Sequence, residues 1–298
     1  MSSQEDENDF TESSSLPQPQ DGCPPYRYLR YEEIASTFFS NDTFQEGQMV
    51  WVCKSKGRKN NKQQSSEEEE EDDDDDPDHG EYQRLELFLR ATVVSCVTSK
   101  GSRIQVQYPK GSTYHVQPSH LIPILPTTIK RLVLVVSETK DYRRACVIHT
   151  HASDTFWEIG SDFGTNVARV YQSTQSDSNK STKEDNENGK QSSVVLGIDK
   201  SSVSIETSQQ RYPHLTFVQW DPLCKNSAIA PLPVQLQESP PPAIIAIDIN
   251  GNRELPAVLQ CLHCVWNVYH WQPRLIIVKS RTLYQRIQQQ EQDESYTK

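Results

Sequence analysis

The sequence predicts an α/β protein: a mostly parallel sheet with helices on both faces, preceded by a small antiparallel β-barrel. From about residue 130 onward, short apolar runs typical of buried strands alternate with amphipathic segments. Four consecutive runs each end in a carboxylate residue. Upstream, residues 45–125 contain short β-branched and aromatic segments separated by Gly, Pro and Ser, a pattern typical of antiparallel strands.

Composition and charge narrow the functional classes. The chain has 298 residues and a formal net charge of -11, but residues 67–78 alone hold eleven acids, so the rest is close to neutral. When the acidic first 25 residues are also set aside, the remainder of the chain is mildly basic. This charge permits nucleic acid as a partner without establishing it. No apolar run approaches the roughly 20 residues that span a bilayer. We expect no membrane association and a cytoplasmic or nuclear location.

Polar, low-complexity stretches divide the chain into parts. Such stretches bury too little apolar surface to offset the entropy lost on ordering. We expect a mostly disordered segment at 1–44, a barrel at 45–125 with a disordered acidic insertion at 54–80, an α/β domain at 130–284 with a disordered insertion at 172–192, and a polar tail at 285–298.

The strings "VWV", "ATVVSC", "RIQVQY" and "VQPSHLIPI" in the first module resemble the Tudor/Agenet or SH3-like barrel pattern. Such barrels often bind methylated Lys or Arg in a cage of aromatic rings, whose faces attract cations. The resemblance therefore implies a basic or methylated peptide as partner, with Trp51, Tyr108 and Tyr114 as candidate cage residues. The alternative is that these rings fill a small core.

The string "FWEIGSDFGTNVARV" carries the first part of a predicted ligand site. A strand ends near Glu158, Gly160 and Gly164 lie in the following turn, and a helix begins near Thr165. A glycine lets backbone pass close to a ligand, and the free amides of a helix start favour a polar or anionic group. By itself the motif is weak, because Asp162 replaces the middle glycine of a G-x-G-x-G turn.

The acids that end the following strands strengthen this interpretation. Asp199 follows Glu158 by about 41 residues, and by about 20 once the polar insertion is subtracted. That is the spacing at which a dinucleotide-type fold places its ribose-binding acid. Asp221 and Asp248 end the next two strands. All four carboxylates are therefore expected at the carboxyl edge of the sheet, where open α/β sheets bind ligands.

This ordered series resembles the class I S-adenosylmethionine-dependent methyltransferases over about 150 residues, and "DINGNREL" and "PRLIIVKSRTLY" resemble an uncharacterised plant and algal group of methyltransferase-like proteins. The resemblance implies S-adenosyl-L-methionine as cofactor. By this resemblance, Glu158 and the glycine turn of the first motif surround the methionine part of the cofactor. Asp199, in the next motif, holds the ribose, and Trp220 with Asp221 contacts the adenine. The implied cofactor-binding residues are Glu158, Gly160, Ser161, Asp162, Gly164, Asp199, Lys200, Trp220, Asp221 and Asp248.

Methyl transfer is an in-line displacement, so positioning the acceptor supplies much of the acceleration and few catalytic side chains are needed. In the family, Asp248, Ile249 and Asn250 match the segment beside the methyl group, and Asp248 is the nearest candidate base. Lys279 resembles the strand-end lysine of ribose 2′-O RNA methyltransferases, with Lys140 as a second lysine; an ordinary ion-paired lysine is the alternative. The catalytic candidates are therefore Asp248 and Lys279. The acceptor is open: a protein, a nucleic acid or a small molecule.

Other functions remain as alternatives. A dinucleotide dehydrogenase would prefer the full G-x-G-x-x-G string, which is absent. An inactive methyltransferase fold could serve as a scaffold whose barrel binds a peptide or nucleic acid, and the Asp162 departure leaves that open.

Cys261 and Cys264 are three residues apart, but a single C-x-x-C favours a buried helix face over a zinc site. Finally, Leu132–Val136 is expected to cover the open edge of the sheet.

Overall fold

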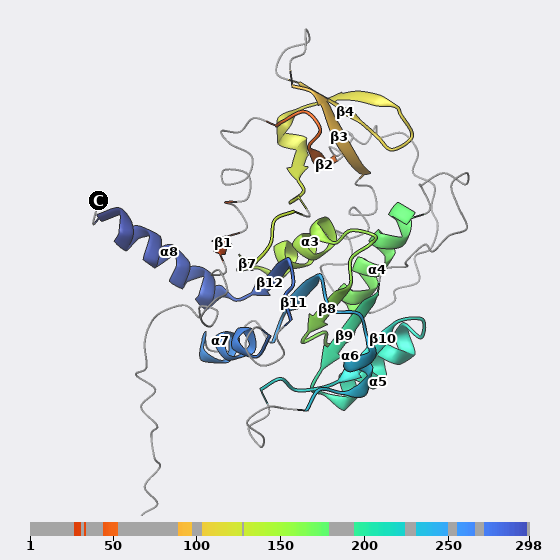
Figure 1. Cartoon of the computed structure of the whole chain (residues 1–298), viewed down its shortest axis with the longest axis vertical. Helices are drawn as coiled ribbons and strands as arrows, with labels where there is room; N and C mark the ends of the chain where they lie inside the picture. Colours follow the sequence, from red (N-terminus) through yellow and green to blue (C-terminus); the bar gives the residue numbers. More distant parts are fainter. Residues whose placement is uncertain are drawn as a thin grey trace, which may run out of the picture.

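A seven-stranded, all-parallel sheet forms the larger part of the computed structural model, with a smaller antiparallel sheet at one end (Figure 1). The structure describes residues 27–30, 33, 44–52, 89–96, 103–126, 128–178, 194–223, 231–249, 255–265 and 271–296. The insertion at 54–80, the part of 172–192 beyond residue 178, and Asn250 lie outside them. None of the described helices is long and apolar enough to cross a membrane.

The large sheet has the order β1-β7-β12-β11-β8-β9-β10. Its strands are β1 (Arg27–Arg30), β7 (Leu132–Val136), β8 (Phe156–Ile159), β9 (Val195–Asp199), β10 (Thr216–Gln219), β11 (Ile244–Ile247) and β12 (Leu275–Lys279). From β10 to β12 this is a Rossmann-like order, in which the chain turns back between β8 and β11. The predicted α/β class is confirmed. β7 does lie in the sheet, beside β12, but β1 forms the outer edge and was not predicted.

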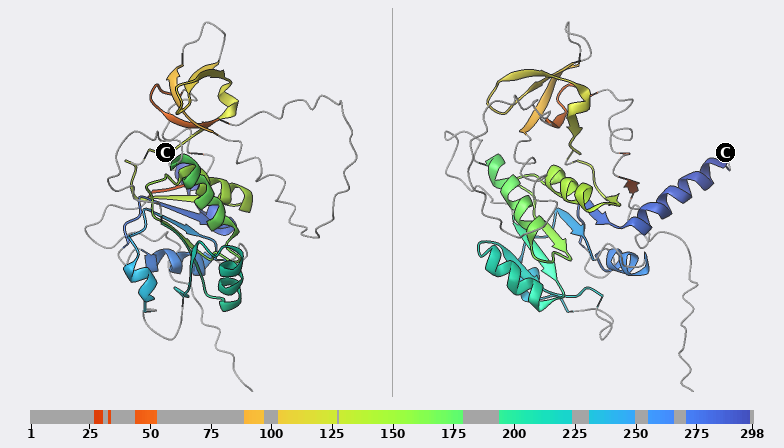
Figure 2. Two further views of the ribbon diagram at one scale, coloured as in Figure 1. Left: turned by 90° about the vertical axis from the view of Figure 1, so that its right-hand side faces the viewer. Right: turned by 180° about the vertical axis from the view of Figure 1, so that it is seen from behind.

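Helices cover both faces of this sheet (Figure 2). One core cluster contains residues of α3 (Thr139–His149), α4 (Thr165–Ser178) and α5 (Ser202–Arg211), and the other contains residues of α6 (Val234–Glu238), α7 (Leu255–His263) and α8 (Arg281–Tyr296). Successive residues of a strand point to opposite faces, so Leu134 belongs to the first cluster and Val135 to the second. Burial on both faces explains why these strands are apolar throughout.

The C-terminal segment differs from its prediction. Helix α8 continues to Tyr296 through the residues expected to be a polar tail. Its first turns bury Leu283 and Ile287 against the sheet, and the Ser280 hydroxyl accepts a hydrogen bond from the Leu283 amide at 3.2 Å. Glutamine and glutamate are good helix formers, so a polar composition here does not oppose a helix that is already nucleated by packing.

The small sheet is antiparallel, as predicted, with the order β5-β4-β3-β2-β6. It consists of β2 (Met49–Val52), β3 (Leu89–Ser95), β4 (Ile104–Gln107), β5 (Thr113–Val116) and β6 (Leu121–Pro123), with the short 3-10 helix Pro118–His120 before β6. Val50, Val93 and Val106 form the centre of its own hydrophobic cluster. The small sheet therefore has a core of its own on one face.

The other face of the small sheet docks onto the α/β domain. Trp51 is only 4% exposed and belongs to the core cluster that contains α3. Arg90 lies 5.4 Å from the centre of the Trp51 ring and donates to the carbonyl of Thr150 at 2.5 Å. Tyr108 packs instead against the small sheet's own cluster, with Tyr114 edge-on at 5.5 Å. Trp51 therefore does not share a cage with the two tyrosines, because it faces the opposite side of the sheet.

Candidate functional site

A pocket lies at the carboxyl edge of the large sheet, where the chain turns back between β8 and β11. It encloses about 400 Å³, part of it open to solvent. Its lining consists of Ile159, Gly160, Asp199, Lys200, Trp220, Asp221, Pro222, Leu223, Asp248 and Ile249. The position is the one at which open α/β sheets bind ligands. Six of the ten cofactor-binding residues implied by the sequence thus line the pocket, and the other four lie in or beneath the adjoining turn.

Two glycines allow the turn after β8 to pack closely. Gly160 has φ +84°, and a Cβ there would lie 2.1 Å from the carbonyl oxygen of Asp248. Gly164 has φ +76°, and its Cβ would lie 2.6 Å from the Phe217 ring. No side chain fits at either distance, so both positions require glycine. Between them, Ser161 is buried, and its hydroxyl has no hydrogen-bond partner among the described residues.

Asp162, which replaces the middle glycine of a G-x-G-x-G turn, has a positive φ. The angle is +47°, in the left-handed region that Asp and Asn tolerate better than most residues. The Asp162 amide donates to Oδ2 of Asp199 at 3.0 Å, and its carbonyl accepts from the Ser208 hydroxyl at 2.9 Å. The backbone of Asp162 therefore ties the turn to the end of β9 and to α5.

The carboxylate of Asp199 is held from both sides at the end of β9. Oδ2 accepts from the Asp162 amide, and Oδ1 accepts from the Ser201 amide at 2.8 Å. Ser201 also caps α5, because its hydroxyl accepts from the Ser204 amide at 3.2 Å. Each carboxylate oxygen can accept a second hydrogen bond. Asp199 is thus fixed in orientation and retains acceptor capacity at the pocket.

Aromatic rings support the far side of the pocket. Trp220, which lines the pocket, lies edge-on to Trp271 with ring centres 6.2 Å apart. Trp271 in turn packs edge-on against buried Trp157 at 4.9 Å. Asp221 follows Trp220, and its Oδ1 accepts from the Leu223 amide at 3.0 Å. This wall therefore combines an apolar surface with a carboxylate.

Asp248 and Lys279 form an ion pair, with 2.8 Å between Oδ2 and Nζ. Burial raises the pKa of Asp248, while the Lys279 ammonium and the Arg143 guanidinium act to lower it. Lys140 is exposed in the first turn of α3. Arg143 lies one turn further along α3, and its positive charge acts on Asp248. The sequence analysis did not identify this residue.

Glu158 lies beneath the pocket, two residues before Gly160, and is 2% exposed. The Tyr142 hydroxyl and the Asn166 amide both donate to its Oε1 at 2.8 Å. Oε2 has no hydrogen-bond partner within the described part of the chain. The pKa of Glu158 is raised to about 7, above all by burial and also by the charge of Asp248, while the hydrogen bonds from Asn166 and Tyr142 act to lower it. Tyr142 and Asn166 were not predicted; the only signal was their place on the buried sides of two helices.

Cys261 of α7 and Cys264, just after this helix, belong to no metal-binding group in the described part of the chain. Cys261 is fully buried, which raises the pKa of its thiol. Cys264 donates to the carbonyl of Pro222 at 3.4 Å. Among the described residues, no group of three or more His, Cys, Asp or Glu side chains could hold a metal ion. Cys261 thus belongs to the buried face of the helix.

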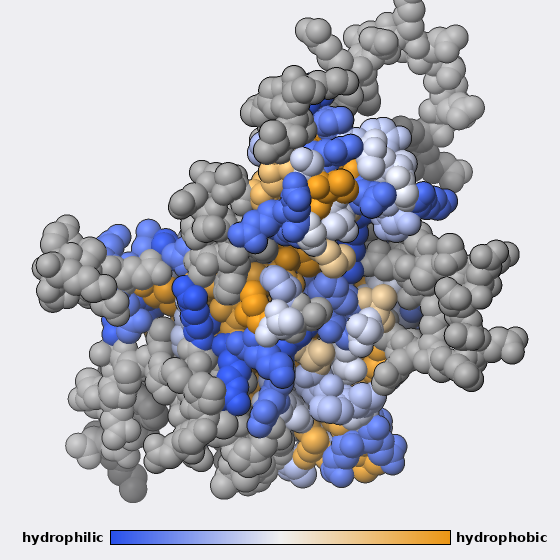
Figure 3. All heavy atoms as spheres, turned by 45° about the horizontal axis from the view of Figure 1, so that its top comes forward, coloured by the Kyte–Doolittle hydropathy of each residue, from blue (hydrophilic) through white to orange (hydrophobic). Residues whose placement is uncertain are grey.

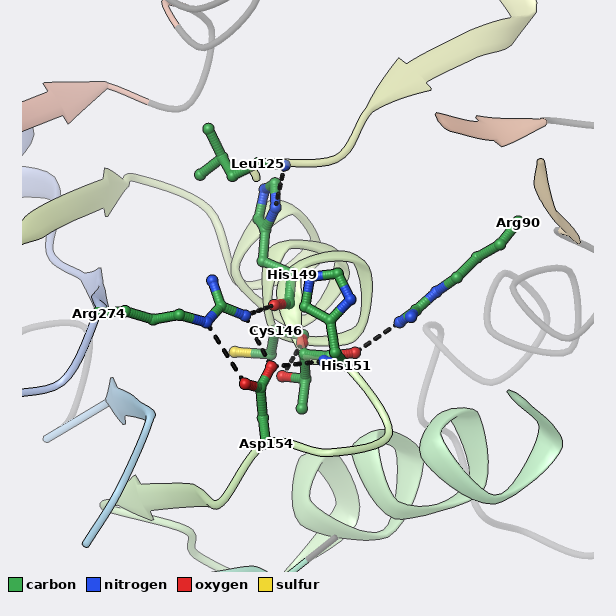
Figure 4. A network of polar contacts seen from close by, with 8 residues as sticks. Arg90, Leu125, Cys146, His149, His151, Asp154 and Arg274 are labelled. Carbon is green, nitrogen blue, oxygen red and sulfur yellow. Dashed lines mark hydrogen bonds and ion pairs between the residues drawn. The ribbon is translucent and has the colours of Figure 1, made fainter. Parts of the chain in front are cut away.

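A second polar cluster lies at the amino end of the strands, on the side where the small sheet docks (Figure 4). Arg274 donates to Asp154 and to the carbonyl of His149, both at 2.7 Å, and the His151 amide donates to Asp154 at 2.7 Å. His149 accepts from the Leu125 amide at 3.4 Å. Burial lowers the pKa of His149 to about 3 and that of His151 to about 4. Both rings are therefore neutral at pH 7, in a packed junction.

On the face of the molecule drawn in Figure 3, hydrophobic residues (orange) lie between hydrophilic ones (blue). The pocket at the carboxyl edge is the candidate site, because residues implied by the sequence line it. Comparison of the chain with protein-family models and with the sequences of curated proteins gives no match.

Proposed function

We propose that this protein is a methyltransferase that binds S-adenosyl-L-methionine in the pocket at the carboxyl edge of the large sheet. The observation that carries the proposal is the carboxylate of Asp199, held by the amides of Asp162 and Ser201 and lining the pocket beside the glycine turn. A Rossmann-like sheet with this arrangement is compatible with a nucleoside ligand. The methyl acceptor is an unidentified protein, nucleic acid or small molecule.

The ribose assignment follows from the number of acceptor sites on Asp199. A carboxylate has two oxygens and about four acceptor sites, of which two are used here. The remaining sites suit two neighbouring hydroxyls, and hydrogen bonds to a charged acceptor are stronger than neutral ones. Trp220 and Asp221 then offer an apolar wall and an acceptor for the base of the nucleoside.

The amino-acid part of the ligand fits the other end of the pocket. The backbone at Gly160 passes close to the backbone of Asp248, which leaves no room for a side chain at this position. The turn therefore places no side chain from Gly160 between the ligand and the backbone. Asp248, which lines the pocket, supplies negative charge that complements a cation. When bound, S-adenosyl-L-methionine would supply an electrophilic methyl group.

At the methyl end, the chain's own residues position the acceptor. Lys279 holds Oδ2 of Asp248, so the carboxylate is oriented before an acceptor arrives. Asp248 accepts a hydrogen bond or a proton from an acceptor that is protonated at working pH. Alignment of the acceptor atom with the methyl group contributes most of the remaining acceleration.

Isothermal titration with S-adenosyl-L-methionine tests the proposal. We expect a micromolar Kd for the intact protein and binding at least about tenfold weaker for Asp199→Ala, because two hydrogen bonds to a charged group are lost. Glu206→Gln, which changes an exposed carboxylate on α5, is the matched control and leaves the Kd unchanged. Failure of the intact protein to bind overturns the proposal, and binding of NAD instead supports a dinucleotide enzyme.

A further inference from the structure

Glu158 is buried among groups from three elements of the large domain. Helix α3 places Tyr142, Arg143 and Cys146 near it, α4 places Asn166, and the end of β11 places Asp248, which Lys279 pairs. The Cys146 thiol is itself fully buried, and burial holds its pKa well above the usual value, so it stays neutral. Arg143 and Asp248 are thus the charged residues that act directly on Glu158.

The two oxygens of Glu158 are not equivalent. Oε1 accepts two hydrogen bonds, from Tyr142 and Asn166, whereas Oε2 has none from the described residues. A buried carboxylate with one unpartnered oxygen is poorly stabilised in its charged form. The neutral carboxyl is therefore well populated at neutral pH when the pocket is empty, in agreement with the pKa of about 7.

Charges in the pocket reach Glu158. Asp248 lines the pocket, and its negative charge raises the pKa of Glu158, while the positive charge of Arg143 lowers it. A cation bound beside Asp248 has the sign of Arg143, so it favours the ionised form of Glu158. By linkage, ionisation of Glu158 must strengthen the binding of that cation by the same factor.

We propose that binding of a cationic ligand in the pocket releases the proton of Glu158 to solvent, with Tyr142 and Asn166 as the positioning residues that hold the carboxylate for this exchange. The inference rests on the proposed function, because S-adenosyl-L-methionine carries a sulfonium and an ammonium charge against a single carboxylate and is therefore a net cation. It adds that the affinity for this ligand is set by pH in the neutral range.

Calorimetry of S-adenosyl-L-methionine binding in two buffers of different ionisation enthalpy, phosphate and imidazole, counts the released protons. For a group that titrates near pH 7, we expect nearly one proton released per ligand at pH 6 and a fraction of one at pH 7.5. The Kd is expected to be weaker at pH 6 than at pH 7.5 by up to about tenfold.

Two variants distinguish proton linkage from a merely structural role. Glu158→Gln keeps the shape of the side chain and should abolish the Glu158 part of the proton release and flatten the dependence of the Kd on pH. Tyr142→Phe removes a hydrogen bond that lowers the pKa of Glu158, so proton release should persist with its midpoint at higher pH. Tyr212→Phe, at a tyrosine packed on the same core cluster, is the matched control and should shift nothing.

The outcomes separate this inference from the proposed function. Ligand binding with equal heats in both buffers and equal Kd values overturns the proton linkage and leaves the cofactor assignment intact. Full proton release in Glu158→Gln overturns it as well, because the proton then comes from another group. If Glu158→Gln does not fold, an unshifted midpoint in Tyr142→Phe contradicts the inference. Absence of any binding by the intact protein is the failure of the proposed function, and the inference fails with it.

Discussion

Nζ of Lys279 lies 2.8 Å from Oδ2 of Asp248, and this ion pair joins the carboxyl ends of the two neighbouring strands β11 and β12. Both side chains are largely removed from water, with exposed fractions of 14% for Lys279 and 19% for Asp248. Removal of one partner therefore leaves a mostly buried charge without compensation.

Lys279→Met should lower the free energy of unfolding by about 1–3 kcal/mol, because the Asp248 carboxylate loses its partner. The double variant Asp248→Asn with Lys279→Met should recover part of that loss. Urea denaturation measures both. Lys200→Met, at an exposed lysine of the same pocket, is the control, and a single variant no less stable than this control contradicts the prediction.

The pKa of Glu158 predicts how stability depends on pH above the acid range. The folded-state pKa of about 7 lies above the ordinary value of 4.5, so the folded protein binds more protons between these values. The contribution of Glu158 is fully present below pH 4.5 and is lost as the pH rises through 7. Glu158→Gln should thus gain stability relative to the natural chain by up to about 3 kcal/mol between pH 5 and pH 8. A difference that is constant with pH, in denaturation series over this range, is the contrary result.

His149 predicts the opposite trend in acid. Its pKa falls from 6.5 to about 3 on burial, so the unfolded chain binds the proton first as the pH drops. Stability is therefore complete above pH 6.5 and declines below it, by about 1.4 kcal/mol per pH unit for this residue. His149→Gln should reduce the slope measured between pH 6 and pH 4. His115→Gln, at an exposed position on β5, should leave it unchanged.

Gly160 and Gly111 allow a matched test of steric exclusion at the pocket. Their φ angles are +84° and +85°, so alanine suffers a similar backbone strain at both positions, about 1–2 kcal/mol. A Cβ at Gly111 meets nothing within 4 Å, whereas at Gly160 it collides with the backbone of Asp248. Gly160→Ala should be markedly more destabilising in thermal unfolding and should displace the turn that lines the pocket. Equal shifts in Tm for the two variants rule out the collision.

Arg90 tests whether the small sheet and the α/β domain unfold together. The Arg90 side chain donates to the carbonyl of Thr150 and covers Trp51, whose ring is shared with the larger core. Arg90→Ala should cost about 2 kcal/mol, through a lost charged hydrogen bond and lost packing. We expect one unfolding transition by tryptophan fluorescence and circular dichroism in the natural chain. Two separated transitions there would show that the sheets are energetically independent.

The carboxyl edge of the site was predictable because each strand that forms it is specified by a short, continuous stretch of sequence. Apolar runs that end in Glu158, Asp199 and Asp248 specify buried parallel strands, and parallel strands bring their ends to one edge. Lys279 was named as a catalytic candidate from a family resemblance, with an ordinary ion-paired lysine as the alternative, and its pairing with Asp248 is seen in the structure. Asp162 was interpreted only as a departure from glycine, because a backbone angle is not written in the residue type.

The rest depends on contacts between distant segments. β1 is four residues long, so no local period distinguishes it from a loop, and its pairing with β7 spans about 100 residues. For Trp51 the sequence left two interpretations open, a binding cage or a small core, because it does not say which face of β2 meets α3. The polar residues after 284 form part of α8, because Leu283 and Ile287 are buried and anchor the first turns of this helix.

The order of the large sheet also determines how the protein can emerge from the ribosome. β12 lies between β7 and β11, yet among the described strands it comes last in the chain. Until Leu275–Lys279 has been made, β7 and β11 each keep an unpaired edge, and such edges promote association with other chains. A chain that stops before β12 therefore lacks an inner strand of the large sheet, and this sheet cannot be completed during translation until β12 has been made.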